Sequence, residues 1–254
     1  MKRGYDVFGK AYEVMLRNDL HDIDSIDHQF LKEMILVDEE SLSFFYERIP
    51  KINEDVTKHE LFEFAQQFRA DQPIDTIKNV LNFTSQIALN YDVDFLDMTF
   101  GGTEKEILIR GTDWCADMVR VGCVLLQCND IPTRIVHLAN VNKAYHGHVV
   151  CEAFFDHGYG MCDFIYGVLG YDEKPISAWE MRLTKNLVTT CYRRNYANYS
   201  VLDDFEGLFS EIAINEYDIV DHNNNFSKSR ANDYTKQIIF ENHDGKWLMG
   251  EDQY

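Results

Sequence analysis

Three residues that are far apart in the chain have the types needed for nucleophilic acyl transfer. The first, Cys115, follows a loop-like segment and falls in the first turn of an expected helix. Backbone N–H groups at a helix start are unpaired and the helix dipole is positive there, so the position favours a thiolate and can stabilise a developing oxyanion. A buried free cysteine is also a common core residue. Cys115 alone is therefore either a packed side chain or a nucleophile.

The other two residues supply a base and a group that orients it, as a thiol nucleophile requires. His148 opens an alternating segment typical of a strand, and Asp163 lies on the next such segment. If the two strands pair around residues 156–159, position 148 lies opposite 165, and 163 and 165 share a face. Asp163 can then accept a hydrogen bond from one ring nitrogen of His148 while the other nitrogen meets Cys115. His146 shares strand parity with His148 and is a rival base.

A longer pattern surrounds these three residues and follows the order of one known superfamily. Its elements are, in chain order, Tyr91, Cys115 with Asp117 two residues on, the segment Ile131-Pro132-Thr133-Arg134, His148 with Glu152 four residues later, and Asp163. From about Leu89 to Tyr166, the chain resembles the transglutaminase-like superfamily, a branch of the papain-like cysteine-enzyme fold. It departs from the family pattern beside each triad residue, at Asp113, Val150 and Phe164, which bears on subfamily and substrate.

The resemblance implies a role for each residue. Cys115 would attack an amide or ester carbonyl, His148 would take the thiol proton and later protonate the leaving amine, and Asp163 would hold the imidazole tautomer. The Cys115 backbone N–H would be one oxyanion donor, and Trp114 a second donor or a substrate-binding group. Arg134 is expected to brace the sheet through an ion pair.

The elements that must position these residues predict an α+β fold. We expect a transglutaminase-like, papain-like core in which the catalytic helix packs on a small antiparallel sheet. The chain, residues 1–254, is interpreted as a single domain with a helical N-terminal elaboration (1–88), the core (89–170) and a C-terminal elaboration (171–254). The expected helices span residues 5–16, 24–37, 56–68, 76–89 and 113–127, and the expected strands span residues 133–139, 148–156 and 161–165.

Composition limits the partners. The 254 residues include 24 Lys and Arg against 43 Asp and Glu, and the net charge of −19 disfavours nucleic acid and anionic membrane surfaces. The sequence shows neither a membrane-spanning apolar run nor a signal peptide. We therefore expect a cytoplasmic protein whose six cysteines stay reduced.

Several alternatives remain open at this stage. A zinc site could use His146, His148, Cys151, Cys162 and Asp163, although no Cys-x-x-Cys pair is present. Cys151 and Cys162 are more simply core residues that face away from the site. The chain could also be an inactive binding or scaffold protein of the same fold. For an enzyme, hydrolysis of a peptide, protein or small amide is favoured over transfer to an amine, no cofactor is expected, and no calcium-binding loop appears.

Overall fold

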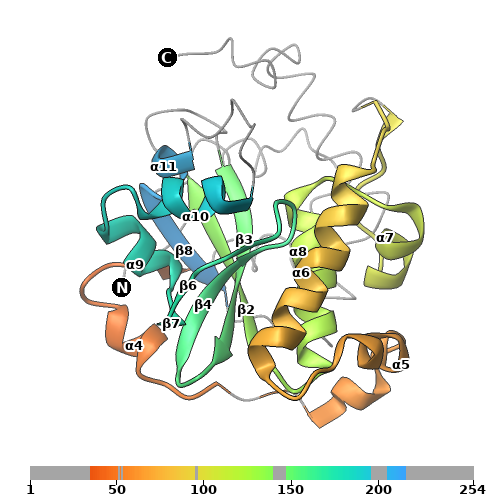
Figure 1. Cartoon of the computed structure of the whole chain (residues 1–254), viewed down its shortest axis with the longest axis horizontal. Coiled ribbons are helices and arrows are strands. Elements are labelled where there is room, and N and C mark those ends of the chain that lie inside the picture. The colour runs from red at the N-terminus through yellow and green to blue at the C-terminus, as the bar shows by residue number, and fades with distance from the viewer. Residues whose placement is uncertain are drawn as a thin grey trace, which may run out of the picture.

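The computed structural model describes residues 35–50, 52, 54–94, 97–139, 147–195 and 205–215. These residues form an α+β fold around an antiparallel sheet with strand order β1-β8-β2-β3-β4-β5 (Figure 1). The α+β class predicted from the sequence is therefore present. The helix predicted at residues 5–16 lies outside the described residues.

The strands of the main sheet are short at its edges and longer in its middle. A separate ribbon of two short strands, β6 and β7, follows β5 in the chain. The strands are β1 (Ile35–Leu36), β2 (Thr133–Ala139), β3 (Gly147–Phe155), β4 (Gly158–Asp163), β5 (Val168–Leu169), β6 (Tyr171–Asp172), β7 (Lys174–Pro175) and β8 (Glu211–Asn215).

Helices fill most of the remaining described chain. The two longest, α6 and α8, agree closely with the helices predicted at 76–89 and 113–127. The helical segments are α4 (Leu42–Tyr46), η1 (Glu54–Lys58), α5 (Phe62–Ala65), η2 (Gln66–Phe68), α6 (Pro73–Leu89), α7 (Glu104–Arg110), α8 (Cys115–Gln127), α9 (Ala178–Leu183), α10 (Leu187–Asn195) and α11 (Phe205–Leu208).

Two predicted helices differ from the structure. The prediction for 24–37 is wrong at its end, because Ile35–Leu36 pair with β8 as strand β1, a long-range contact that local periodicity does not encode. The helix predicted for 56–68 is divided into η1, α5 and η2. At the division, the ring nitrogen Nδ1 of His59 accepts a hydrogen bond from the N–H of Leu61 at 3.2 Å and so takes the place of a helical carbonyl.

The hairpin of β3 and β4 fixes the register of the candidate site. Asp156 and His157 form its turn with positive φ angles of 51° and 63°, as a two-residue turn of this hand requires. Cys151 lies opposite Cys162, and continuing the register by three residues puts His148 opposite Ile165. The predicted relation between positions 148 and 165 therefore follows from the observed pairing.

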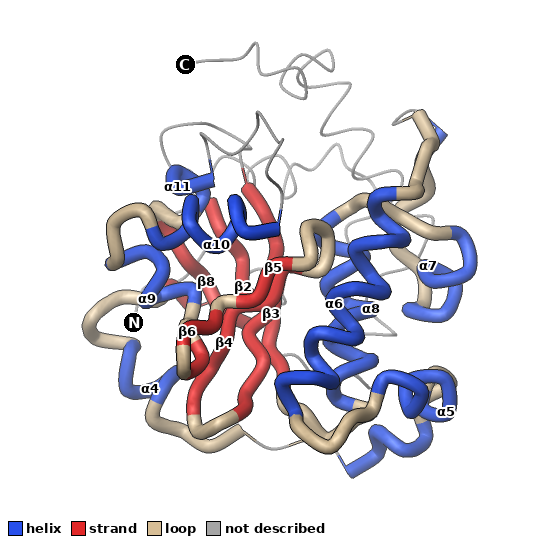
Figure 2. Tube along the Cα trace, viewed as in Figure 1, coloured by secondary structure: helices blue, strands red, loops and turns tan. Residues whose placement is uncertain are grey.

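Apolar side chains cover both faces of the sheet. One core cluster joins α6 and α8 to residues such as Cys151 and Cys162, and the other joins α9, α10 and α11 to residues such as Val150 and Met161. Figure 2 shows the two groups of helices on opposite sides of the strands. Because side chains alternate between the faces, His148 and Asp163 share the face of Val150 and Met161, which α10 covers.

The sheet extends beyond the predicted core at residues 89–170. Strand β8 lies between β1 and β2 in the sheet order, so segments from both flanking regions complete it. Within the described residues, no helix has both the length and the apolar character needed to cross a membrane.

Candidate active site

A short loop delivers the chain from α7 to the start of α8, where Cys115 lies. Gly111 ends α7 with a φ of 75°, and a Cβ at this position would lie 3.3 Å from the Tyr91 ring. This conformation is one that glycine adopts without strain. The buried Thr112 then accepts a hydrogen bond from the N–H of Trp114 at 2.9 Å through its Oγ1. The close packing of Gly111 and the hydrogen bond between Thr112 and Trp114 thus fix the loop that leads to Cys115.

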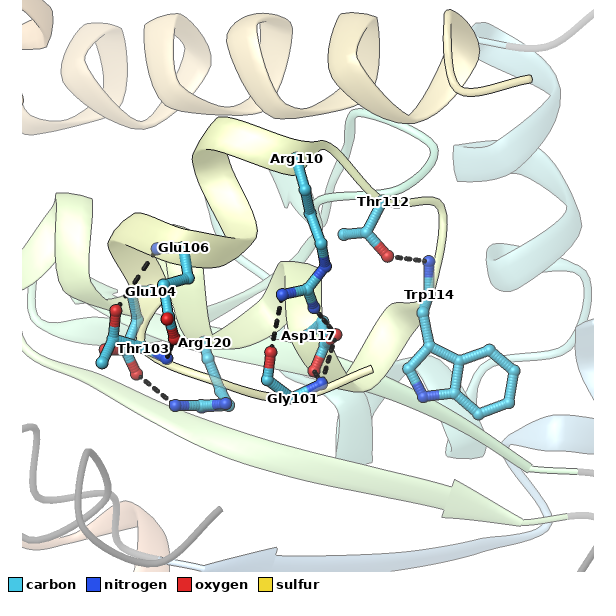
Figure 3. Close-up of polar contacts among 9 residues, drawn as sticks. All are labelled: Gly101, Thr103, Glu104, Glu106, Arg110, Thr112, Trp114, Asp117 and Arg120. Atoms are coloured by element: carbon cyan, nitrogen blue, oxygen red, sulfur yellow. Dashed lines mark hydrogen bonds and ion pairs between the residues drawn. The ribbon is translucent and has the colours of Figure 1, made fainter. Parts of the chain in front are cut away.

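Two ion pairs, one buried and one partly buried, join α7 to α8 (Figure 3). Arg110 donates to Asp117 at 2.6 Å, and Arg120 donates to Glu104 at 2.9 Å. Asp117 also accepts a hydrogen bond from the N–H of Gly101, so the first turn of α8 is tied to the segment that precedes α7. Burial raises the pKa of Asp117, although the two arginines oppose that shift. These contacts give Asp117 a structural role.

The start of α8 differs from the starts of α7 and α9. Thr103 and Ser177 each begin their helix with a complete capping box. The N-cap of α8 is Trp114, and its side chain makes no capping hydrogen bond. The N–H groups of the first turn, beginning with that of Cys115, are therefore left for another acceptor. The side chain of Cys115 is partly exposed.

His148 and Asp163 are brought together on the opposite side of the β3–β4 pair from Cys151 and Cys162. Nε2 of His148 lies 2.7 Å from Oδ2 of Asp163, and both residues are buried. Asp163 is the last residue of β4, and His148 is the second residue of β3. This places the pair at the end of the sheet where β3 begins.

Asp163 is held by four hydrogen bonds, two to each oxygen. Oδ1 accepts from the N–H groups of Ile165 at 3.0 Å and Tyr166 at 3.2 Å. Oδ2 accepts from the Tyr192 hydroxyl at 2.6 Å in addition to His148. The carboxylate is therefore satisfied without solvent and fixed in rotation.

Charge keeps the buried imidazole protonated. Burial by itself lowers the pKa of His148, but the charge and hydrogen bond of Asp163, together with contact with Cys115, raise it to about 10. Burial raises the pKa of Asp163, yet His148 and Tyr192 bring it below its ordinary value. The pair is thus an imidazolium and a carboxylate at neutral pH.

Cys115 reaches His148 from the helix on the other face of the sheet. The thiol is one of the hydrogen-bonding and charged groups that raise the pKa of His148. Since Nε2 of the imidazole is engaged by Asp163, Nδ1 is the nitrogen left to face the sulfur. The structure thus brings the three predicted triad residues together in the order sulfur, imidazole, carboxylate.

Trp114 lies beside the site in a small aromatic cluster. Its ring packs edge-on against Phe100 at 4.9 Å between centroids, and it contacts the group that includes Met98 and Tyr91. Because its backbone N–H already donates to Thr112, that N–H is not an oxyanion donor. A contribution of Trp114 to the site would have to come from its indole.

Arg134 and Glu152 form the ion pair expected from the sequence. The two residues are register partners on β2 and β3, and Glu152 Oε2 accepts from Arg134 Nε at 2.8 Å and Nη2 at 2.6 Å. The guanidinium also donates to the Phe45 carbonyl at 2.6 Å and lies 3.6 Å from the Tyr159 ring centroid. This pair braces the middle of the sheet and lies outside the triad.

Two of the rival residues, Cys151 and Cys162, lie on the other face of the strands from His148. Cys151 and Cys162 are buried in the core cluster beside α8, as predicted for residues facing away from the site. His146 lies outside the described residues. Within the described parts of the chain, no three His, Cys, Asp or Glu side chains are arranged to hold a metal ion.

Sequence reasoning missed Tyr192. This residue reaches Asp163 from α10 across a separation of 29 residues. No motif spacing connects the two positions, and an aromatic residue in a helix is ordinarily a core residue. The signal is spatial and depends on how α10 packs over the end of β4.

No protein-family model, curated protein or solved structure matches this chain. The function is therefore argued from the geometry of the site together with the sequence pattern.

Proposed function

We propose that this protein is a cysteine-dependent acyl-transfer enzyme with a transglutaminase-like, papain-like core. Its nucleophile is Cys115, its acid–base group is His148, and its orienting group is Asp163. The observation that carries the proposal is the buried His148 imidazole, bound to Asp163 at 2.7 Å through one nitrogen and influenced by the Cys115 thiol. Displaced pKa values of this kind concentrate at functional sites.

In the first half-reaction the sulfur of Cys115 attacks the carbonyl carbon of an amide. The oxygen of the tetrahedral intermediate accepts a hydrogen bond from the Cys115 N–H at the uncapped start of α8. Collapse breaks the C–N bond, Nδ1 of His148 protonates the departing amine, and an acyl thioester remains on Cys115. Asp163 stabilises the imidazolium throughout and keeps Nε2 protonated.

In the second half-reaction water is the favoured acceptor. Neutral His148 removes a proton from water, the hydroxide attacks the thioester carbonyl, and collapse releases a carboxylic acid and the Cys115 thiolate. Hydrolysis of a peptide, protein or small amide is proposed ahead of transfer to an amine, because the sequence offers no positive sign of cross-linking. An ester is the other substrate class that fits the same chemistry.

The buried pair, placed beside a cysteine, supports an enzyme over an inactive scaffold of the same fold. Burying an imidazolium and a carboxylate carries a desolvation cost, and well-packed apolar groups often replace such pairs without loss of stability. In addition, an imidazolium beside a cysteine is the partner that activates thiols. The free state of Cys115 and the other five cysteines fits a reducing compartment, and we propose a cytoplasmic location.

Acylation of the intact protein tests the proposal. The protein is treated with a library of activated amides and esters, and peptide mass spectrometry locates the acyl group. We expect acylation at Cys115, and we expect Cys115→Ala to lose turnover by at least about 1000-fold with little change in stability. Cys128→Ala removes a buried thiol at the other end of α8 and is the matched control.

Alkylation provides a second measurement of the same site. At pH 6, Cys115 is expected to react with iodoacetamide well above the rate of a free thiol, and His148→Gln should remove the difference. Turnover that survives in Cys115→Ala, or alkylation no faster than that of a free thiol, would contradict the assignment.

A further inference from the structure

We propose that Tyr192 is a positioning residue of the active site, acting on the reaction through Asp163. Its hydroxyl holds the carboxylate against His148 and takes up part of the charge on the oxygen that His148 binds. The inference rests on the proposed function and adds to it a residue that lies outside the triad.

The geometry places two donors on one oxygen. Oδ2 of Asp163 lies 2.6 Å from the Tyr192 hydroxyl and 2.7 Å from Nε2 of His148. The other oxygen, Oδ1, is held by the N–H groups of Ile165 and Tyr166. The carboxylate therefore cannot rotate to give His148 a different oxygen without breaking several bonds. The hydrogen bond from the Tyr192 hydroxyl stabilises part of the negative charge on Oδ2. That oxygen therefore stabilises the His148 imidazolium less strongly than it would alone.

Packing fixes Tyr192 in the orientation that this contact needs. Its side chain is fully buried, and its ring lies 4.4 Å from the Phe205 ring and 6.0 Å from the Tyr166 ring, measured between centroids. Burial and the charge of Asp163 raise the pKa of Tyr192 well above its ordinary value, so the hydroxyl remains a donor over the working pH range.

The titratable groups around the contact come from five parts of the fold. Besides Asp163 at the end of β4 and His148 on β3, they are Cys115 from α8, Tyr166 from the turn after β4, and Cys191 beside Tyr192 in α10. Of these, Asp163 is the carboxylate to which the Tyr192 hydroxyl donates. Replacing Tyr192 by phenylalanine removes that donor and retains the ring that fills the space.

A second tyrosine, Tyr46 at the end of α4, contacts a carboxylate of the same sheet and provides a matched control. Tyr46 donates to Oε1 of Glu152 at 3.0 Å, and the other oxygen of Glu152 is paired with Arg134. This carboxylate also combines a tyrosine hydroxyl with a cationic partner, but its guanidinium does not exchange a proton in the reaction. Tyr46→Phe thus removes an equivalent hydroxyl away from the triad.

The test compares Tyr192→Phe with Tyr46→Phe on two substrates with the same acyl group, an amide and an activated ester. Without the hydroxyl, Asp163 becomes a stronger base and His148 holds its proton more tightly. Tyr192→Phe is therefore expected to lower kcat/KM for the amide about tenfold. The ester, whose leaving group departs without protonation, should lose far less. The alkaline limb of the rate–pH profile should move to higher pH.

Incorporation of 3-fluorotyrosine at position 192 sharpens the same test. Its hydroxyl is a stronger donor, so the alkaline limb should move to lower pH, and this variant keeps the hydrogen bond if Tyr192→Phe proves too unstable to assay. Tyr46→Phe should leave the pH profile and the amide-to-ester ratio unchanged.

The outcomes separate the inference from the proposed function. If Cys115 is acylated in the unmodified protein while neither Tyr192 variant changes the pH profile or the amide-to-ester ratio, Tyr192 is a packing residue and the inference is wrong. If Cys115 is not acylated by any substrate of the library, the proposed function fails and the inference falls with it.

Discussion

Strand β3 contributes one residue to each of two buried acid–base pairs. Comparing the two pairs shows how a structural ion pair differs from one that could take part in a reaction. Glu152 pairs with Arg134 in the middle of the sheet, and His148 pairs with Asp163 at its end. Each carboxylate accepts four hydrogen bonds, two on each oxygen, and one of the four comes from a tyrosine hydroxyl. The surroundings of the two carboxylates are therefore closely alike.

The two pairs differ in their cations. Arg134 has an elevated pKa, directs its donors to Glu152 and the Phe45 carbonyl, and is enclosed by aromatic rings. His148 can lose a proton and keeps one ring nitrogen for the thiol of Cys115. A fully satisfied buried carboxylate therefore says little about function by itself. The difference lies in the cation that pairs with the carboxylate. A histidine can exchange a proton during a reaction, whereas an arginine keeps its proton and here serves only to stabilise the fold.

The largest expected effect comes from breaking the brace. Arg134→Met leaves Glu152 buried with no cation, and we expect it to lower the free energy of unfolding by about 3–5 kcal/mol, measured by urea denaturation. The double variant Arg134→Met/Glu152→Gln is the control, because removing both charges should restore part of the loss. Equal stability in the single and double variants would show that the pair is not coupled.

The candidate catalytic pair should instead show itself through pH. The pKa of His148 is about 10 in the folded protein, above its ordinary value, so its stabilising effect is complete below pH about 6.5 and is lost as the pH rises to about 10. We expect up to roughly 4 kcal/mol of pH-dependent stability over this interval. His148→Gln should flatten the dependence, whereas Cys128→Ala should retain it. A wild-type curve that is already flat would contradict the protonated state.

A smaller loss of stability should follow from a substitution that crowds the residue next to Asp163 and leaves the Arg134–Glu152 pair unchanged. A Cβ on Gly122 of α8 would lie 2.3 Å from the ring of Phe164, the residue directly after Asp163. Gly122→Ala is therefore expected to lower the free energy of unfolding by about 1–3 kcal/mol and to slow the proposed acyl transfer by displacing the end of β4. The control Gly122→Ala/Phe164→Leu gives the methyl group room and should recover both. Unchanged melting and turnover in the single variant would refute this packing argument.

Local pattern was sufficient for the elements nearest the site. Strand β2 has the predicted bounds, and α8 begins two residues after the predicted start at 113. Alternation and the turn at residues 156–159 also predicted the relation of position 148 to position 165, because register in a tight hairpin is set by its turn. The convergence of Cys115, His148 and Asp163 was inferred from order and spacing, and the structure brings these residues together.

Contacts between distant segments could not be predicted in this way. Strand β1 was assigned to a helix, because its partner β8 follows almost 180 residues later and leaves no local trace. The hydroxyl of Tyr192 was missed for the same reason. The division of the predicted helix at His59 coincides with a side-chain acceptor in place of a backbone carbonyl. The spacing of apolar residues gives no sign of such a contact.

The position of β8 between β1 and β2 has a consequence for synthesis of the protein on the ribosome. Strand β1 pairs with β8 and precedes it by well over a hundred residues. When β3 and β4 emerge from the exit tunnel, β8 has not yet been synthesised. The edge of β2 is then unpaired, and β1 lacks the strand with which it pairs. The sheet can be completed only after β8, which ends at Asn215, has been synthesised, so its last strand pairings are long-range, and chains stalled before that point expose the unpaired edge of β2.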